Sequence, residues 1–147
     1  MRVLYSLGDV YAFLPIEDAE KLKDYVLQNG VEKAVDLWLE NIPVTELPVV
    51  PFAGTIGDCD DITFAERFRN EFDMFICGHP KYKKDRELLI SNGSPITIAI
   101  ASSIALVLAK VLCVSAAIIT PVVLLLIRLV GEMTVNAYCN NKKSCED

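Results

Sequence analysis

The sequence predicts a small α+β domain followed by a transmembrane helical hairpin, and three observations lead to this fold class. Residues 88–127 carry one charged side chain, Lys110. This apolar run is longer than the roughly 20 apolar helical residues that are needed to cross a bilayer. Basic residues flank this run, and the preceding chain is acidic with helical periodicity. The predicted parts are a mainly helical domain with a β-hairpin (1–90), a hinge (91–95), a membrane region (96–138) and a cytosolic tail (139–147).

Charge is unevenly distributed along the 147 residues. Residues 1–80 hold 15 acidic and 6 basic side chains, whereas residues 81–86 carry a net charge of +3. Basic residues mark the cytosolic side of a span, and Lys142 and Lys143 follow the apolar run. Both ends are therefore expected in the cytosol, with two crossings of a plasma or inner membrane. The acidic domain argues against nucleic acid as the main partner.

The N-terminus and the cysteines lead to further expectations about the compartment. Residues 1–19 lack the basic start and apolar stretch of a secretory signal, so we expect a cytosolic N-terminus. The five cysteines have no repeated spacing, which argues against a disulfide framework. Cys139 and Cys145 could pair only if the C-terminus lay outside the cytosol.

The first half of the chain contains one predicted hairpin and several predicted helices. Residues 2–7 and 10–14 alternate large apolar and aromatic residues around Gly8-Asp9, which predicts a β-hairpin. Residues 16–29 and the segment starting at Val31 have helical periodicity, with Gly30 as a stop between them. Trp38 is expected in the core of the second of these helices.

A third helix is predicted around an aromatic stripe. It follows a proline- and valine-rich stretch over residues 42–57, which is expected to be an extended linker or an edge strand. Its phenylalanines are spaced four residues apart, and Asp60 or Asp61 stands where an N-cap is wanted. The stripe is either core or a partner surface. It consists of Phe64, Phe68 and Phe72.

Candidate metal and catalytic residues are few. Asp58, Asp60 and Asp61 lack the glycine turn and distal glutamate of a calcium loop. Cys77 and His79, with Cys59 as a third ligand, fall short of the four that structural zinc needs. His79 is the only histidine and has no adjacent nucleophile motif. We therefore expect no metal, no cofactor and no enzymatic activity.

Two helical spans are predicted within the membrane region. Ser94-Pro95 is typical of a helix start, which places the first span at 96–119. Thr120-Pro121 is the strongest break, so the second span is predicted at 122–138. One continuous helix kinked at Pro121 is the alternative, because transmembrane helices tolerate proline.

Small residues follow one side of the first predicted span. Small side chains let helices approach in lipid, so this side predicts association with the second span or with other copies. The residues are Ala99, Ser102, Ser103, Ala109, Cys113 and Ala117.

Ionisable and polar residues form a second stripe in the membrane region. Arg128, Glu132 and Asn136 are spaced four residues apart, and Arg128 and Glu132 are expected to pair. A hairpin would place Lys110 at a similar depth to Arg128. The two cations either anchor the helices at the headgroups or line a polar contact between copies.

These observations favour a self-associating membrane effector whose soluble domain senses a partner and whose helices perturb or permeabilise the bilayer. Membrane lipid and either further copies or a partner subunit are then its expected partners. The alternative is an interaction protein: a membrane-anchored adaptor or accessory subunit of a larger membrane complex, without pore activity, that holds a partner through its acidic face or its phenylalanine stripe. Both hypotheses rest on chain architecture and not on a residue motif.

Overall fold

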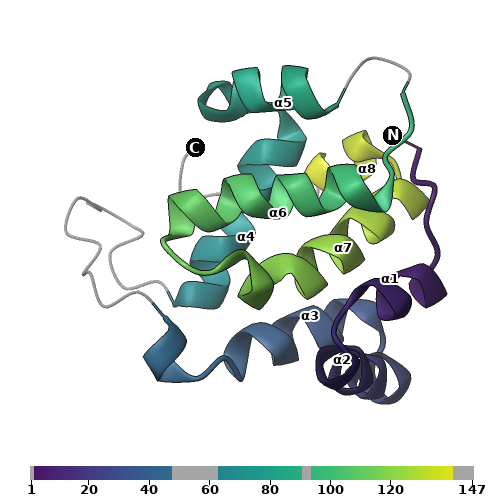
Figure 1. The fold of residues 1–147 in the computed structure, drawn as a ribbon. Coiled ribbons are helices and arrows are strands. Elements are labelled where there is room, and N and C mark those ends of the chain that lie inside the picture. Colours follow the sequence, from purple (N-terminus) through teal and green to yellow (C-terminus); the bar gives the residue numbers. More distant parts are fainter. Residues whose placement is uncertain (1, 48–62, 91–93, 141–147) are drawn as a thin grey trace.

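The computed structural model describes residues 2–47, 63–90 and 94–140, and within these residues the chain is helical (Figure 1). Its β pairing in this part is one parallel bridge between Val3 and Ile96. The helices are α1 (Leu7–Phe13), α2 (Ile16–Asn29), α3 (Val31–Glu40), α4 (Phe64–Cys77), α5 (Lys83–Leu89), α6 (Ile98–Leu112), α7 (Ala116–Glu132) and α8 (Val135–Asn140), with 3₁₀ turns η1 (Val44–Glu46) and η2 (Pro80–Tyr82).

Helix α7 lies at the centre of the bundle (Figure 1). Its side chains at residues 121–127 are all buried, as expected for a helix that is apolar on every side. Helix α6 pairs with it, and α1, α3 and α8 also contact it. One hydrophobic core joins residues of α3 and α4 with residues of α6 and α7. The two halves of the chain therefore share a core.

The structure contradicts the predicted membrane hairpin and the predicted integral membrane localisation. Among the described residues, no helix has both the length and the apolar character needed to cross a bilayer. Helices α6 and α7 have 15 and 17 residues. At 1.5 Å per residue they are about 22 Å and 25 Å long, against a hydrocarbon core of about 30 Å.

The turn between the two apolar helices lies earlier than predicted. Cys113 ends α6 in the left-handed region with φ 62°, and the Ser115 side chain caps α7 by accepting a hydrogen bond from the Ala117 amide. Pro121, the predicted turn, lies inside α7. At the other end, α6 begins at Ile98 and is capped by Thr97, so Ser94-Pro95 does not start it.

The predicted β-hairpin at the N-terminus is also wrong. Residues 7–13 form α1, and Ser6 and Asp9 make a reciprocal capping box at its start. The Ser6 hydroxyl accepts from the Asp9 amide at 3.1 Å, and the Asp9 carboxylate accepts from the Ser6 amide at 2.9 Å. This capping signature competes with the Gly8-Asp9 turn signal, and it decides the local structure.

Three predicted helices of the first half are confirmed. Helices α2 and α3 occupy 16–29 and 31–40, and Gly30 separates them with φ 86°. Helix α4 contains the phenylalanine stripe, but its cap is Thr63, whose hydroxyl forms a capping box with Glu66. Asp60 and Asp61, the expected caps, lie outside the described residues, as does most of the predicted 42–57 linker.

The N-terminal segment is fastened across α7. The Leu4 amide donates to the Ile96 carbonyl at 2.9 Å, and the Tyr5 hydroxyl donates to the Leu124 carbonyl at 2.8 Å. Val3 lies against Gly131, where a Cβ atom would come within 2.6 Å of the Val3 Cγ2 atom. Glycine at position 131 is therefore what lets this segment reach α7.

Gly131→Ala is expected to lower the free energy of unfolding by about 1–3 kcal/mol, because the new methyl group overpacks this contact. Urea denaturation of the purified protein measures the loss. Val3→Ala removes the clashing Cγ2 atom, so the double variant should recover part of it. A double variant that loses the sum of the two single effects would contradict the proposed contact.

Buried carboxylates on α4 are bonded to tyrosines. The Tyr138 hydroxyl of α8 donates to Asp73 Oδ1 at 2.5 Å, and the Tyr82 hydroxyl donates to Glu71. Burial raises the pKa of both tyrosines above the usual range, and the facing carboxylates raise it further. The hydroxyls thus stay protonated as donors.

A disulfide between Cys77 and Cys139 also joins α4 to α8, contrary to the expectation from cysteine spacing.

Candidate interaction site

The surface formed by α2, α3 and η1 is the most acidic part of the described chain. Residues 16–46 contain eight acidic and three basic side chains. The two helices pack against each other and have helical periodicity, so their apolar sides face the core and their charged sides face solvent. Six of the acidic residues are exposed: Glu17, Glu20, Asp24, Glu32, Glu40 and Glu46. We call this region the acidic surface.

The basic residues that follow α4 lie elsewhere. Helix α5 contacts α6, whereas α3 contacts α7, so the two charged regions lie on different sides of the α6–α7 pair (Figure 1). Arg86 donates hydrogen bonds to the carbonyls of Phe75 and His79 at 3.2 and 2.9 Å. These bonds help to satisfy backbone carbonyls at the end of α4, where the helix itself supplies no donor. Lys81 pairs with Glu71 at 2.9 Å. Two of the basic residues therefore have structural contacts.

Trp38 anchors the acidic surface to the core. Its indole Nε1 donates to the carbonyl of Ile118 in α7 at 2.8 Å, and only 6% of the residue is exposed. This confirms the predicted core position. The ammonium of Lys21 in α2 lies 5.1 Å from the centre of the indole ring, within the range of a cation–π interaction.

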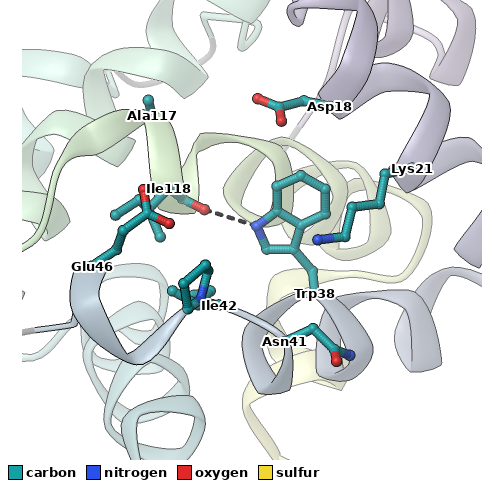
Figure 2. A pocket seen from close by; sticks show the side chains of 9 residues that line it. Asp18, Lys21, Trp38, Asn41, Ile42, Glu46, Ala117 and Ile118 are labelled. Carbon is teal, nitrogen blue, oxygen red and sulfur yellow. Dashed lines mark hydrogen bonds between the residues drawn. The ribbon is translucent and has the colours of Figure 1, made fainter.

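A pocket of about 270 Å³ opens beside this tryptophan (Figure 2). It is built from α2, α3, η1 and the first turn of α7, and it combines an apolar floor with charged walls. The lining residues are Asp18, Lys21, Trp38, Asn41, Ile42, Pro43, Glu46, Ala117 and Ile118. Figure 2 shows the carboxylates of Asp18 and Glu46 at different walls, with Lys21 beside the ring.

Proline also changes the hydrogen bonding of α7 at the pocket. Pro121 has no amide hydrogen, so the carbonyl of Ala117 lacks the donor that a helix normally supplies four residues later. The adjacent Ile118 carbonyl accepts from Trp38, and the Thr120 hydroxyl donates to Ala116 at 2.7 Å. The proline therefore removes the usual donor of one backbone carbonyl in the first turns of α7, next to the residues that line the pocket.

The predicted phenylalanine stripe lies mainly in the core. Phe68 and Phe72 are fully buried, and Phe64 is half-buried. Phe72 also meets the Tyr138 ring edge-on at a centroid distance of 6.1 Å. Of the two interpretations of this stripe, core packing is the one that accounts for Phe68 and Phe72, because buried rings offer a partner no surface.

The predicted association residues lie on α6, at its C-cap (Cys113) and at the start of α7 (Ala117), and they do not form the buried side of α6. Ser102 and Ser103 each donate to the carbonyl of Ala99, at 3.0 and 3.1 Å, and Cys113 and Ala117 are exposed. Ala109 is the one buried member of the predicted set. The buried side consists of Ala101, Ile104, Ala105, Leu108, Ala109 and Leu112.

The predicted polar residues of the membrane region are divided among three helices. Arg128 and Glu132 form the expected pair at 2.8 Å, and Arg128 also donates to the carbonyl of Tyr5 at 3.1 Å. Asn136 lies beyond the end of α7, in α8, and Lys110 is exposed near the end of α6. Arg128 therefore helps to hold the N-terminal segment.

Of the candidate metal ligands considered in the sequence, Cys77 and His79 lie within the described residues. Cys77 is bonded to Cys139, and His79 Nδ1 accepts a hydrogen bond from the Lys81 amide at 3.1 Å. Cys59 and the aspartates at 58, 60 and 61 lie outside the described residues. Within the described ranges, no group of three or more histidine, cysteine, aspartate or glutamate residues is placed to hold a metal ion.

Sequence reasoning identified the acidic character of this region but missed the pocket. Trp38 and Ile118 are 80 residues apart, and no local sequence pattern in either segment predicts their contact. Comparison with protein-family models, curated proteins and solved structures finds no match for the chain. The candidate site therefore rests on geometry and charge alone.

Proposed function

We propose that the protein is an interaction module that holds a partner protein by binding a basic segment of that partner on the acidic surface. This is the adaptor alternative without its membrane anchor. The observation that carries the proposal is the pocket at Trp38, which opens within a segment of net charge −5 and is lined by an indole and two carboxylates. Complementary charge gives such a surface its partner choice and a fast association rate.

A binding role accounts for these features better than a membrane effector or an enzyme. The effector hypothesis depends on spans, and the described helices offer none. An enzyme would depend on His79 with Cys77 or on the aspartates at 58, 60 and 61. His79 accepts a backbone hydrogen bond, Cys77 is in a disulfide, and the aspartates lie outside the described residues. The acidic surface, by contrast, leaves exposed carboxylates around a recess, which suits a positively charged partner.

Fluorescence anisotropy with a short labelled peptide of alternating arginine and serine tests the proposal. We expect saturable binding to the full chain that weakens as salt concentration rises, since exposed charges are screened. An alternating glutamate and serine peptide of equal length should not bind. Absence of binding by the arginine peptide at low salt would overturn the proposed function.

Glu40→Lys is expected to weaken binding of this peptide about fivefold, because it replaces an attractive charge on the acidic surface with a repulsive one. Glu87→Lys on α5 is the matched control, since it changes net charge equally from an exposed site away from that surface. Both positions lie in the last turn of a helix, where a lysine is compatible with the helix dipole. Equal weakening by the two substitutions would contradict a localised site.

A further inference from the structure

We infer that the Trp38 pocket is a subsite for one arginine side chain of the basic partner, and that Lys21 competes with that side chain for the indole ring. The inference rests on the proposed function and goes beyond it, since it names the side chain that is recognised and a residue that limits affinity. It follows from the acceptors, the ring and the size of the pocket.

The polar groups of the pocket match a guanidinium. Asp18 and Glu46 contribute carboxylates from α2 and η1 at different walls of the pocket. Guanidinium has five N–H donors and no acceptor, and its planar fork pairs with carboxylates through two parallel bonds. An anionic group would instead meet two negative charges and one positive charge.

The indole offers a cation a fixed platform. Its N–H is already bonded to Ile118, so the ring is held in one orientation and its own donor is satisfied. Lys21 already places a cation 5.1 Å from the ring centre, which shows that a positive charge fits there. Guanidinium stacks on aromatic faces and is more weakly hydrated than ammonium, so arginine should be preferred to lysine at this position.

Lys21 has an alternative place when the pocket is occupied. Its side chain is exposed, and its ammonium is also 5.9 Å from the ring centre of Tyr25. It can therefore leave the indole while keeping an aromatic contact. The pocket volume of about 270 Å³ lies below the range typical of sites for drug-sized ligands, which fits a single side chain.

Lys21→Ala is therefore expected to tighten binding of the alternating arginine peptide about threefold, because it removes the competing cation. Lys23→Ala is the matched control: it makes the same change of charge on the same helix, at an exposed residue that does not line the pocket. It should give the smaller gain expected from net charge alone.

Peptides with lysine or with neutral citrulline in place of arginine test the side-chain preference. We expect the lysine peptide to bind about threefold to tenfold more weakly, and the citrulline peptide more weakly still. Trp38 is the only tryptophan of the chain, so its fluorescence reports directly on the pocket. The arginine peptide should change this fluorescence more than the lysine peptide does at saturation.

The outcomes separate the two proposals. Equal affinity for the arginine and lysine peptides, or equal gains from Lys21→Ala and Lys23→Ala, would overturn the arginine subsite and leave the acidic surface as a general basic-peptide site. Unchanged Trp38 fluorescence at saturation would also overturn the subsite. Failure of every basic peptide to bind would overturn the proposed function and the subsite together.

Discussion

Leu125→Asp is expected to unfold the protein or to lower its free energy of unfolding by at least about 4 kcal/mol. Leu125 lies in the centre of α7 and is 0% exposed. Truncating a buried leucine costs about 2–5 kcal/mol. The new carboxylate would also be desolvated among apolar neighbours, with no group placed to donate a hydrogen bond to it. Small domains have a total stability of about 5–15 kcal/mol. Thermal unfolding followed by circular dichroism measures the effect.

Leu106→Asp is the matched control for this prediction. Leu106 lies in the same apolar run, on α6, but 53% of it is exposed. The same substitution there should change stability little, as is usual at surface sites. The contrast tests the bundle directly, because helices whose outer sides face lipid would also be disrupted at the position that is exposed here. Equal loss at both positions would contradict the structure.

Hydropathy alone predicted a membrane hairpin because a central core helix and a membrane span have the same composition. Residues 121–127 of α7 are all apolar and buried because the rest of the bundle surrounds them. What separates the two cases is continuous length, and the chain breaks at Cys113, which adopts the left-handed conformation usually taken by glycine or asparagine. A cysteine is a weak signal for such a stop, whereas Pro121 is a strong signal that was misleading.

Pro121 is tolerated inside α7 because the surrounding helices bury residues 121–127 in the core, although the proline removes the usual amide donor of the Ala117 carbonyl. The Thr120 hydroxyl donates to the carbonyl of Ala116, and Trp38 donates to the carbonyl of Ile118. The hydrogen bond from Trp38 comes from a residue 80 positions earlier in the chain, so the sequence around the proline does not predict it. The predicted turn failed because tertiary contacts overrode a local rule.

Local signals were sufficient where the structure is itself local. Helices α2 and α3 were predicted from their periodicity and from Gly30, which takes φ 86° at the junction. Helix α1 had an equally local signal, the capping pair Ser6 and Asp9, but the turn signal at Gly8-Asp9 was preferred to it. The pocket had no local signal, since its walls come from two distant segments.

Loss of the disulfide is expected to lower the free energy of unfolding by about 2–4 kcal/mol. Cys77 and Cys139 are 62 residues apart, with Cα atoms at 5.7 Å. In the chain-entropy description, a cross-link over a loop of this length restricts the unfolded chain by about 4 kcal/mol. The Cys77→Ala/Cys139→Ala variant and the wild-type protein in reductant should show the same loss in urea denaturation, because both remove the same bond.

Cys113→Ala supplies the control, since Cys113 is exposed and unpaired within the described residues. It should change stability by less than about 0.5 kcal/mol, and mass spectrometry of unreduced proteolytic fragments should recover the peptides of Cys77 and Cys139 joined. The Tyr138 bond to Asp73 does not depend on the disulfide, so α8 should remain docked in the native state after reduction. A wild-type protein whose unfolding is unaffected by reductant would contradict the bond. Disulfides persist in oxidising compartments and are reduced in reducing ones, so this part of the stability depends on the compartment.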